Sequence, residues 1–430
     1  MTLAVSVALL ASVSAHAQEQ EPDRVSIGVR VGATHSDNIE RLPVDELSDT
    51  TGELGLIADV TRTRGRLNVG LASDLRYQKY FNDTFGDELI GGLNGTLSYW
   101  FLPERFRWTV QDNFAQTFID PTAVETPDNR QNINYFSTGP DLRLPLGSRT
   151  TLELQARWSQ ARYETSDSDD ERLMGSIGVV RQLGAHSALS INARNETVEF
   201  RESTLDDGYD RRSAYLGFNA VGARTRLSAV GGVTALRSFV QTNDAPMFDL
   251  LVARELTARS VLTLNVGTNL TDSAEMLRRG QTVGGVQPGN ENIIASLDPF
   301  QSDYARLAWT FTGARTALAL GADYREEDHE VTDELNRTTR AGNLRVTRRM
   351  SSVLALNVGG EWRREELDQS AITFDEWSAG LGVDWTLSAD ASLLFRGDHF
   401  KGTGDTFAGG GTRNYTENRF SVAIQYTPHW

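Results

Sequence analysis

The side chains that usually carry catalysis are few and scattered in this chain. Of the six histidines, His16 lies close to the N-terminus and the others stand at positions 35, 186, 329, 399 and 429, without the spacing of a metal site. The sequence contains no Gly-x-Ser-x-Gly, His-Glu-x-x-His or phosphate-binding-loop motif. The adjacent pairs Asp328-His329 and Asp398-His399 would need further partners at one rim to form a hydrolytic site. We therefore expect no enzyme and no cofactor.

Acidic segments near 166–170, 206–210 and 326–334 are a second set of candidate ligands. Carboxylate oxygens bind Ca²⁺, and such clusters also link lipopolysaccharide through bridging cations. Asp167, Asp169 and Asp170 are weak calcium candidates, but none of the segments has EF-hand spacing. Solvated loop tips are the simpler interpretation, and we expect no dedicated metal site.

A third set of charges lies on stretches in which apolar and polar residues alternate. Nine of these charges could face a common polar interior: Glu153, Arg157, Asp323, Arg325, Glu361, Arg363, Glu365, Glu376 and Asp384. Opposite charges along a pore wall would orient a polar solute. They would also neutralise one another and keep the interior wet, and the sequence leaves both interpretations open.

The alternation that positions these charges recurs along the whole chain. In residues 260–272, for example, Leu262 and Leu264 share one face, whereas Thr263 and Asn265 share the other. A period of two predicts β-strands. Twenty such segments lie near 24–34, 51–62, 66–80, 87–101, 105–119, 130–144, 150–164, 171–183, 187–202, 209–222, 225–240, 246–257, 260–272, 301–313, 315–326, 337–348, 352–366, 372–387, 390–401 and 415–427.

The connections between these segments alternate in length. Odd-numbered connections such as 35–50 and 273–300 are long and polar, whereas even-numbered ones such as 63–65 and 388–389 are tight. Long loops at one rim and short periplasmic turns at the other are typical of outer-membrane barrels. An even number of strands also places both termini on the short-turn side.

The two faces of the segments differ too strongly for a soluble sandwich. One face is apolar from strand to strand, while the other carries many charges that a dry core would not tolerate. A backbone in lipid satisfies its hydrogen bonds only as a helix or a closed sheet. We therefore predict an all-β fold, a transmembrane antiparallel β-barrel of about twenty strands (alternatively eighteen) with a polar lumen. Aromatic residues around one tight turn are expected to form part of the interfacial girdle: Trp100, Phe101, Phe106 and Trp108.

Composition agrees with one exported domain. The 430 residues include no cysteine, and the net charge of −16 argues against binding nucleic acid. Beyond the first seventeen residues, no apolar run approaches the roughly twenty needed for a spanning helix. The apolar stretch 3–14 followed by Ala15-His16-Ala17 predicts a cleaved signal peptide over residues 1–17. Residues 18–430 then form a single barrel domain in the cell outer membrane.

The last predicted strand carries a candidate assembly signal. Phe420, Val422, Ile424 and Tyr426 alternate with other residues, and the chain ends at Trp430. A terminal aromatic residue after an alternating strand resembles the signal read by the outer-membrane barrel assembly machinery, although an ordinary final strand is the alternative. We expect this machinery, outer-membrane lipid and lipopolysaccharide to be partners.

The start of the predicted barrel carries a family resemblance. Residues 32–50, GATHSDNIERLPVDELSDT, contain Ser36-Asp37-Asn38-Ile39, an Arg41-Leu42-Pro43 step and Ser48-Asp49. An alternating strand, a short basic turn and a tyrosine-rich strand follow. This opening resembles the β-barrel porin-2 group of outer-membrane proteins over about the first quarter of the chain. The resemblance implies a passive barrel associated with exopolysaccharide-export or exosortase loci, with a polysaccharide and periplasmic export components as partners. Asp37-Asn38 is expected to cap a strand or close an Asx-type turn.

Three functions remain open on these observations. The first is a passive channel or scaffold for secretion of extracellular polysaccharide, the second a porin for small polar solutes, and the third a structural barrel without transport. A constricting loop would help to distinguish a porin from a wide conduit, and 273–300 is long enough to fold inward. We expect no TonB-dependent receptor, because no plug-sized segment precedes the first predicted strand.

Overall fold

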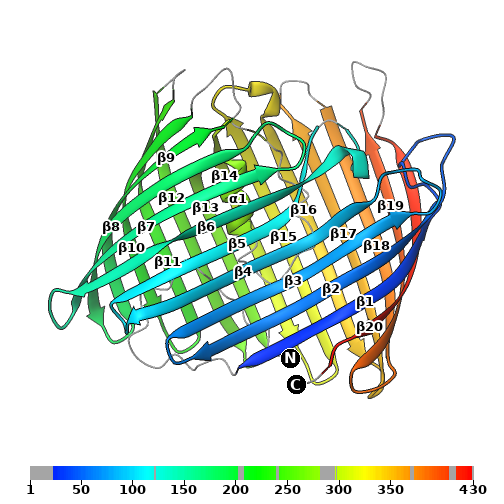
Figure 1. Cartoon of the computed structure of the whole chain (residues 1–430), viewed down its shortest axis with the longest axis horizontal. Helices are drawn as coiled ribbons and strands as arrows, with labels where there is room; N and C mark the ends of the chain where they lie inside the picture. The colour runs from blue at the N-terminus through cyan, green and yellow to red at the C-terminus, as the bar shows by residue number, and fades with distance from the viewer. Residues whose placement is uncertain are drawn as a thin grey trace.

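The computed structural model describes residues 23–120, 123–201, 208–238, 242–280, 296, 298–368, 372–405 and 413–428. The architecture is all-β, with one antiparallel sheet of twenty strands that closes on itself (Figure 1). Twenty strands confirm the larger of the two predicted counts. The predicted signal peptide and Trp430 lie outside the described residues.

Each strand has 12 to 16 residues, enough to cross a hydrocarbon layer at the tilt of membrane barrels. In chain order the strands are β1 (Arg24–Ser36), β2 (Asp49–Arg64), β3 (Leu67–Tyr80), β4 (Glu88–Leu102), β5 (Phe106–Phe118), β6 (Arg130–Pro145), β7 (Thr150–Tyr163), β8 (Asp170–Gly184), β9 (Ser187–Phe200), β10 (Tyr209–Val221), β11 (Thr225–Ser238), β12 (Thr242–Thr257), β13 (Ser260–Thr271), β14 (Phe300–Thr312), β15 (Thr316–His329), β16 (Arg337–Arg349), β17 (Leu354–Leu367), β18 (Ile372–Thr386), β19 (Ala391–Gly404) and β20 (Tyr415–Tyr426). Each predicted segment overlaps one strand, with boundaries that differ by four residues or fewer. The period-two pattern was therefore sufficient to locate the strands.

Hydrogen bonding runs around the whole barrel. Each strand pairs with the strands before and after it in the chain, and β1 also pairs with β20. This last pairing joins Val29 to Tyr426 and Ser36 to Arg419. Because the sheet has no free edge, its backbone N–H and C=O groups are satisfied without water.

The connections define two different rims. Alternate connections of two to four residues, such as 65–66 and 185–186, form the short-turn rim. The other rim carries 37–48, 119–129 and 272–299, and we call it the long-loop rim. The first residue of β1, Arg24, and the last residue of β20, Tyr426, both lie at the short-turn rim. By the usual asymmetry of such barrels, the short turns face the periplasm.

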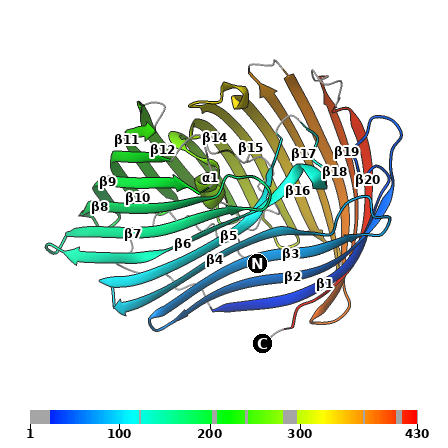
Figure 2. The ribbon, with the colours of Figure 1, turned by 45° about the horizontal axis from the view of Figure 1, so that its top comes forward.

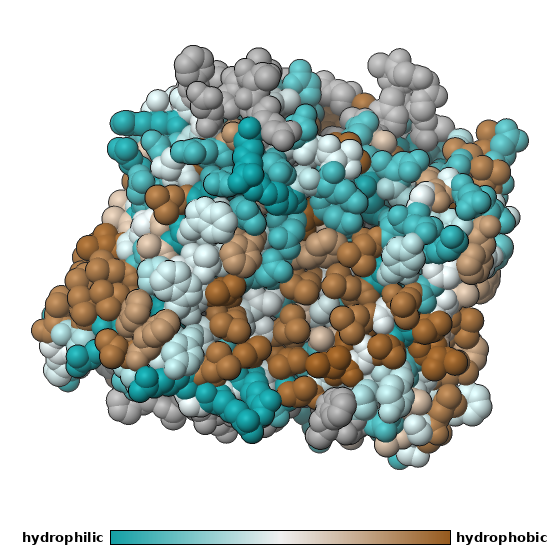
Figure 3. Space-filling view, viewed as in Figure 1, coloured by the Kyte–Doolittle hydropathy of each residue, from teal (hydrophilic) through white to brown (hydrophobic). Residues whose placement is uncertain are grey.

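The outer face carries an apolar belt. Val29, Leu56 and Leu75 are cross-strand neighbours on this face. Exposed apolar side chains recur around the barrel, with Phe420 65% exposed and Leu216 53% exposed. Figure 3 shows the belt as brown patches nearer the short-turn rim, with hydrophilic residues above it. Apolar exposure on this scale requires hydrocarbon rather than water.

One predicted girdle residue lies on the opposite face. Phe101 and Trp108 are exposed on the outer face, and the Phe101 ring stacks on Phe106. Trp100 instead has the guanidinium groups of Arg107 and Arg143 at 5.4 Å and 5.9 Å from its ring centre. Consecutive residues of a strand point to opposite faces, so Trp100 cannot join Phe101 in the girdle. The expectation for Trp100 was wrong.

In the described part of the chain, three short helices belong to the long-loop rim: α1 (Ser273–Gly280), η2 (Pro127–Asn129) and η3 (Asp333–Leu335). Among the described residues, no helix has the length and apolar character to cross a membrane. The helix α1 follows β13 and turns into the barrel, where residues 274–277 are at most 9% exposed (Figure 2).

Candidate functional site

The helix α1 shows which face of the sheet is the interior. It starts directly after β13, yet its side chains contact strands that are not neighbours of β13. Leu277 packs with Ala115 of β5 and Ile133 of β6. Met276 Sδ lies 3.4 Å from Nη1 of Arg325 on β15. Such contacts are possible only through the inside of a closed barrel, and Figures 1 and 2 show α1 there.

The nine charged residues predicted to face a lumen all belong to this interior face. The register aligns Asp323 with Arg306, which pairs with it at 3.1 Å. The nine residues occupy four places: Glu153 and Arg157 on β7, Asp323 and Arg325 on β15, Glu361, Arg363, Glu365 and Glu376 on β17 and β18, and Asp384 nearer the short-turn rim. Their role as the lining of a solute path stays a prediction.

Glu153 and Arg157 belong to a charged group on β5–β7. Arg157 donates to Asp141 Oδ1 at 2.6 Å, and Arg107 donates to Asp141 Oδ2 at 2.7 Å. Arg143 and Glu153 approach to 3.4 Å, and each side chain is 27% exposed. This part of the wall therefore keeps partly hydrated charges in the short-turn half of the barrel.

One deeply buried charge of the interior is Arg41, a residue with no predicted role. It belongs to the connection between β1 and β2 and is 3% exposed. Its guanidinium lies 3.1 Å from Glu417, 3.4 Å from Glu125 and 3.6 Å from Glu376. The ring centre of Tyr415 lies 4.9 Å from it, within cation–π distance. We call these five residues the seam cage, because they lie beside the junction of β1 and β20.

Ionisation in the loop residues of the seam cage reflects a balance between burial and charge. Burial opposes the negative charge of Glu125, but attraction to Arg41, Arg363 and Arg130 outweighs it and lowers the pKa of Glu125 to about 2. Burial also opposes the charge of Arg41, but Tyr415 and the surrounding carboxylates raise its pKa well above the usual value. Glu125 and Arg41 are therefore both charged at neutral pH.

The first long loop holds Arg41 in place through side-chain hydrogen bonds. Asn38 Nδ2 donates to the Leu42 carbonyl at 2.7 Å, and Asn38 Oδ1 accepts from the Leu42 N–H at 2.9 Å. Asp37 accepts from the N–H and from Nδ2 of Asn418 on β20, both at 2.7 Å. Arg41 itself has φ +55°, a left-handed conformation that non-glycine residues adopt when their surroundings enforce it. Asn38 thus closes a turn, as expected, while Asp37 binds the neighbouring strand.

A second group of buried charges holds α1, and we call it the latch: Asp170, Arg172, Arg194, Glu196, Arg211, Asp272 and Glu275. Arg172 of β8 pairs with Asp272 at 2.8 Å. Glu275 pairs with Arg211 of β10 and, at 3.5 Å, with Arg194 of β9. Asp272 also accepts from the Glu275 N–H at 3.0 Å and so caps the first turn of α1.

The attraction between the carboxylates and the guanidinium groups of the latch is strong because these charges are buried together. Burial opposes the charge of Asp272, but Arg172 and Arg211 outweigh it and lower the pKa of Asp272 to about 2. Glu196 also pairs with Arg194 at 3.0 Å, so both guanidinium groups of β9 and β10 have a partner on the wall. Breaking a buried pair leaves an uncompensated charge in a medium that solvates it poorly. The latch therefore opposes movement of α1 out of the lumen.

Three further charges join α1 to the opposite wall. Arg337 of β16 donates to Glu327 at 2.7 Å, and Arg325 lies 3.5 Å from Glu327. Because Arg325 also contacts Met276, α1 is supported from β15 as well as from β8–β10. Among the latch residues only Asp170 was singled out from the sequence, and there as a weak calcium candidate rather than as a partner of an arginine. Polar loop residues carry no periodic signal, and a partner far along the chain cannot be recognised from local spacing.

The weak calcium candidates do not converge in the structure. Asp169 accepts from Arg162 at 3.2 Å, and Asp170 accepts from Arg172 at 2.6 Å. Asp167 is exposed. Within the described ranges, no group of three His, Cys, Asp or Glu side chains is arranged to hold a metal ion. Arginine side chains, rather than a shared cation, therefore bind the carboxylates of Asp169 and Asp170.

The two Asp-His pairs do not form a catalytic arrangement. Each pair lies within one strand, so the carboxylate and the adjacent ring point to opposite faces. Asp398 pairs with Arg396 at 2.9 Å, while His399 Nδ1 lies 2.8 Å from Asn418 Oδ1. Neither observation gives these histidines a role in general base catalysis.

The alternating residues of the candidate assembly signal lie on the outer face of β20. Phe420, Val422, Ile424 and Tyr426 are between 43% and 65% exposed. Their recognition by the assembly machinery stays a prediction, because Trp430 lies outside the described residues.

The closed sheet, the apolar belt and the charged interior together define this chain as an outer-membrane β-barrel. No family profile and no curated protein matches its sequence. In a search of solved structures, the ferric enterobactin receptor PfeA of Pseudomonas aeruginosa, in complex with enterobactin, matches with 10% identity and a TM-score of 0.49, over 95% of this chain and 82% of that chain.

Two further barrels match at the same level. The siderophore receptor PirA of Pseudomonas aeruginosa matches with 13% identity and a TM-score of 0.46, over 96% of this chain and 81% of that chain. The FrpB iron transporter of Neisseria meningitidis matches with 9% identity and a TM-score of 0.47, over 94% and 81%. These likenesses concern the barrel and carry no argument about a substrate.

Proposed function

We propose that the chain is a passive outer-membrane channel for small polar solutes, with α1 as its constriction. The observation that carries this proposal is the position of α1, which extends inward from the long-loop rim and is held by the latch. Ala274, Met276 and Leu277 of α1 form one buried cluster with residues of β5 and β6, on a part of the wall several strands from β13. A loop placed in this way narrows a pore that roughly twenty strands would otherwise leave wide.

The distribution of burial supports a narrow path rather than a wide one. Interior residues toward the long-loop rim, such as Arg363, Glu365 and Glu417, are at most 7% exposed. Glu153, in the short-turn half, and Glu361 keep more exposure. A solute would therefore pass from a wet vestibule to a constriction lined by opposite charges. Such a wall favours small molecules that carry their own hydrogen-bonding or charged groups.

Secretion of extracellular polysaccharide is the second candidate. It is supported by the resemblance of residues 32–83 and by the interior position of Trp100, beside Arg107 and Arg143. An aromatic ring among charged partners is a surface on which a sugar could stack. This ring lies at the short-turn rim, where an exported polymer would enter. In this function α1 would have to move, because a polymer chain is thicker than a small solute.

The experiment that tests the first proposal is single-channel conductance of the purified full chain in planar bilayers. The double variant Asp272→Asn with Glu275→Gln removes both carboxylates that tie α1 to arginines, and we expect its conductance to be several-fold higher than that of the wild type. Glu361→Gln is the matched control, since it removes an interior carboxylate that is exposed and has no ion pair to α1. If wild type and double variant both fold and neither conducts, the chain is a structural barrel rather than a channel.

Polysaccharide secretion is tested in cells by deleting the gene. Loss of surface polymer together with unchanged uptake of small solutes would favour the second candidate over the first. Complementation with Trp100→Ala would then restore less polymer than the wild-type gene does. Unchanged polymer with reduced solute uptake would support the channel.

A further inference from the structure

A groove of about 690 Å³ lies on the outer wall of the barrel, across β8 to β12. Its floor is made by small and apolar side chains: Gly175, Ile177, Ala193, Ala214, Val233 and Ala235. Ile177 is 49% exposed and Val233 is 60% exposed, so this is the lipid-facing side of the sheet. Small residues on four adjacent strands, β8 to β11, leave room between the larger side chains, which is a shape suited to a linear acyl chain.

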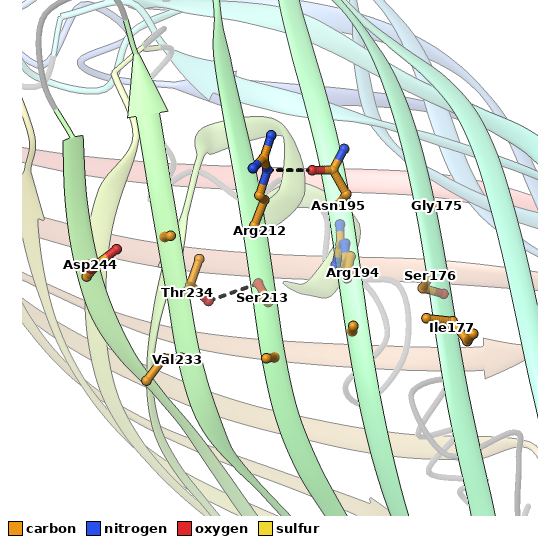
Figure 4. A pocket seen from close by; sticks show the side chains of 13 residues that line it. Gly175, Ser176, Ile177, Arg194, Asn195, Arg212, Ser213, Val233, Thr234 and Asp244 are labelled. Atoms are coloured by element: carbon orange, nitrogen blue, oxygen red, sulfur yellow. Dashed lines mark hydrogen bonds between the residues drawn. The ribbon is translucent and has the colours of Figure 1, made fainter.

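Polar groups border the end of the groove nearer the long-loop rim. Figure 4 shows Arg212 and Asn195 above the apolar residues, with Ile177 and Val233 below them. Arg212 Nε donates to Asn195 Oδ1 at 3.1 Å. Asp244, on β12, lines the other side of this end. The groove thus changes from apolar to charged along its length, as a lipid does between its acyl chain and its headgroup.

Arg212 differs from three other outward arginines near the long-loop rim, each of which has an acidic partner. Arg162 pairs with Asp169 at 3.2 Å, Arg340 with Glu366 at 3.0 Å and Arg364 with Glu366 at 2.8 Å. For Arg212, Asn195 is the only hydrogen-bond or ion-pair partner in the described part of the chain. An exposed guanidinium with several N–H groups still available, at the edge of an apolar surface, is complementary to a phosphate.

We propose that this groove binds the phosphorylated lipid A portion of lipopolysaccharide. One acyl chain would occupy the apolar floor, and a phosphate would accept hydrogen bonds from Arg212 and sit beside Asn195. The position favours lipid A over a phospholipid, because the charged end lies toward the long-loop rim, which faces the outer leaflet where lipopolysaccharide resides. Asp244 would repel the phosphate directly, so a divalent cation between them would strengthen binding.

The test measures lipid A retained by the purified full chain in detergent, by native mass spectrometry. Arg212→Glu reverses the charge at the headgroup end, and Ala214→Leu fills the acyl end without changing charge. We expect each variant to retain about tenfold less lipid A than wild type, the scale of one lost charge-assisted contact or one blocked chain. Arg340→Ala is the matched control, because it removes an outward arginine on the far side of the barrel, and it should retain lipid A normally.

Two results would overturn the proposal. One is equal lipid A retention by wild type, Arg212→Glu and Ala214→Leu when all three show the same heat-modifiable barrel band on gels. The other is equal retention of dimyristoyl phosphatidylglycerol and lipid A by the wild type, which would show non-specific adhesion of anionic lipid. Addition of a chelator should lower lipid A retention by the wild type, and it should have less effect on Asp244→Asn.

Discussion

The seam cage and the latch hold loops inside the barrel with the same chemistry but in opposite arrangements. In the seam cage one cation, Arg41, lies among carboxylates from the loop between β5 and β6, from β18 and from β20. In the latch the loop supplies the carboxylates, Asp272 and Glu275, and the wall supplies the arginines. The wall also carries Glu196, which shares those arginines.

The arrangement decides how much each residue matters. Removing Arg41 leaves three carboxylates without their common partner. Removing Glu275 leaves Arg194 and Arg211 still paired with Glu196, and Asp272 still holds the start of α1. Each of these carboxylates keeps one further arginine: Arg130 for Glu125 at 4.0 Å, Arg363 for Glu376 at 3.8 Å and Arg419 for Glu417 at 2.5 Å. Arg41 is the one cation that all three share, whereas in the latch Arg194 and Arg211 both contact Glu196 and Glu275. A redundant attachment suits a constriction that moves, and a single shared cation suits a junction that must not open.

Replacement of Arg41 by methionine should have the largest effect on stability. It removes the cation that Glu125, Glu376 and Glu417 share, and breaking a buried ion pair from one side costs about 3–5 kcal/mol. The free energy of unfolding, measured with urea in detergent micelles, should fall by that amount. Arg41→Lys should lose less, since the charge remains. A change below 1 kcal/mol in Arg41→Met would show that the seam cage does not stabilise the barrel.

Acidification should have the second largest effect on stability, because it weakens the seam cage. The pKa of Glu125 is lowered from 4.5 to about 2 in the folded chain. A lowered pKa means that the stabilisation is fully present above pH 4.5 and is lost as the pH falls toward 2. The loss from this group is about 3 kcal/mol at most. Between pH 7 and pH 2, the free energy of unfolding should therefore fall less steeply with decreasing pH in Glu125→Gln than in wild type. Parallel curves of this free energy against pH would contradict the prediction.

Neutralising a single carboxylate of the latch should have the smallest effect on the free energy of unfolding. Glu275→Gln is expected to lower the free energy of unfolding by about 1 kcal/mol, because Glu196 continues to neutralise both arginines. Arg278→Ala, which removes a partly exposed partner of Glu275 on α1 itself, should change it by less than 1 kcal/mol. A loss in Glu275→Gln as large as that in Arg41→Met would remove the distinction between the two clusters.

The strands could be predicted from the sequence because alternation is a local signal. It located all twenty strands and put Glu153, Asp323 and Glu376 on one face of the sheet, because alternate side chains within a single strand point to opposite faces. The same rule, applied strictly, would have placed Trp100 inside. The loop charges carried no such signal. Arg41 and Asp272 look like ordinary solvated loop residues until the barrel closes around them, and the only hint was the resemblance around residues 36–43.

The junction of β1 and β20 also bears on the order in which the chain folds. Ser36 Oγ donates to Glu417 Oε1 at 2.6 Å across 381 positions of sequence, and Asp37 and Arg41 bind the same short segment of β20. Contacts of such long range form late, because the entropy of closing the intervening chain must first be overcome. Until β20 arrives, Arg41 lacks Glu417 and stays hydrated at the open edge. Burial of Arg41 is thus completed only when the last strand docks and closes the sheet.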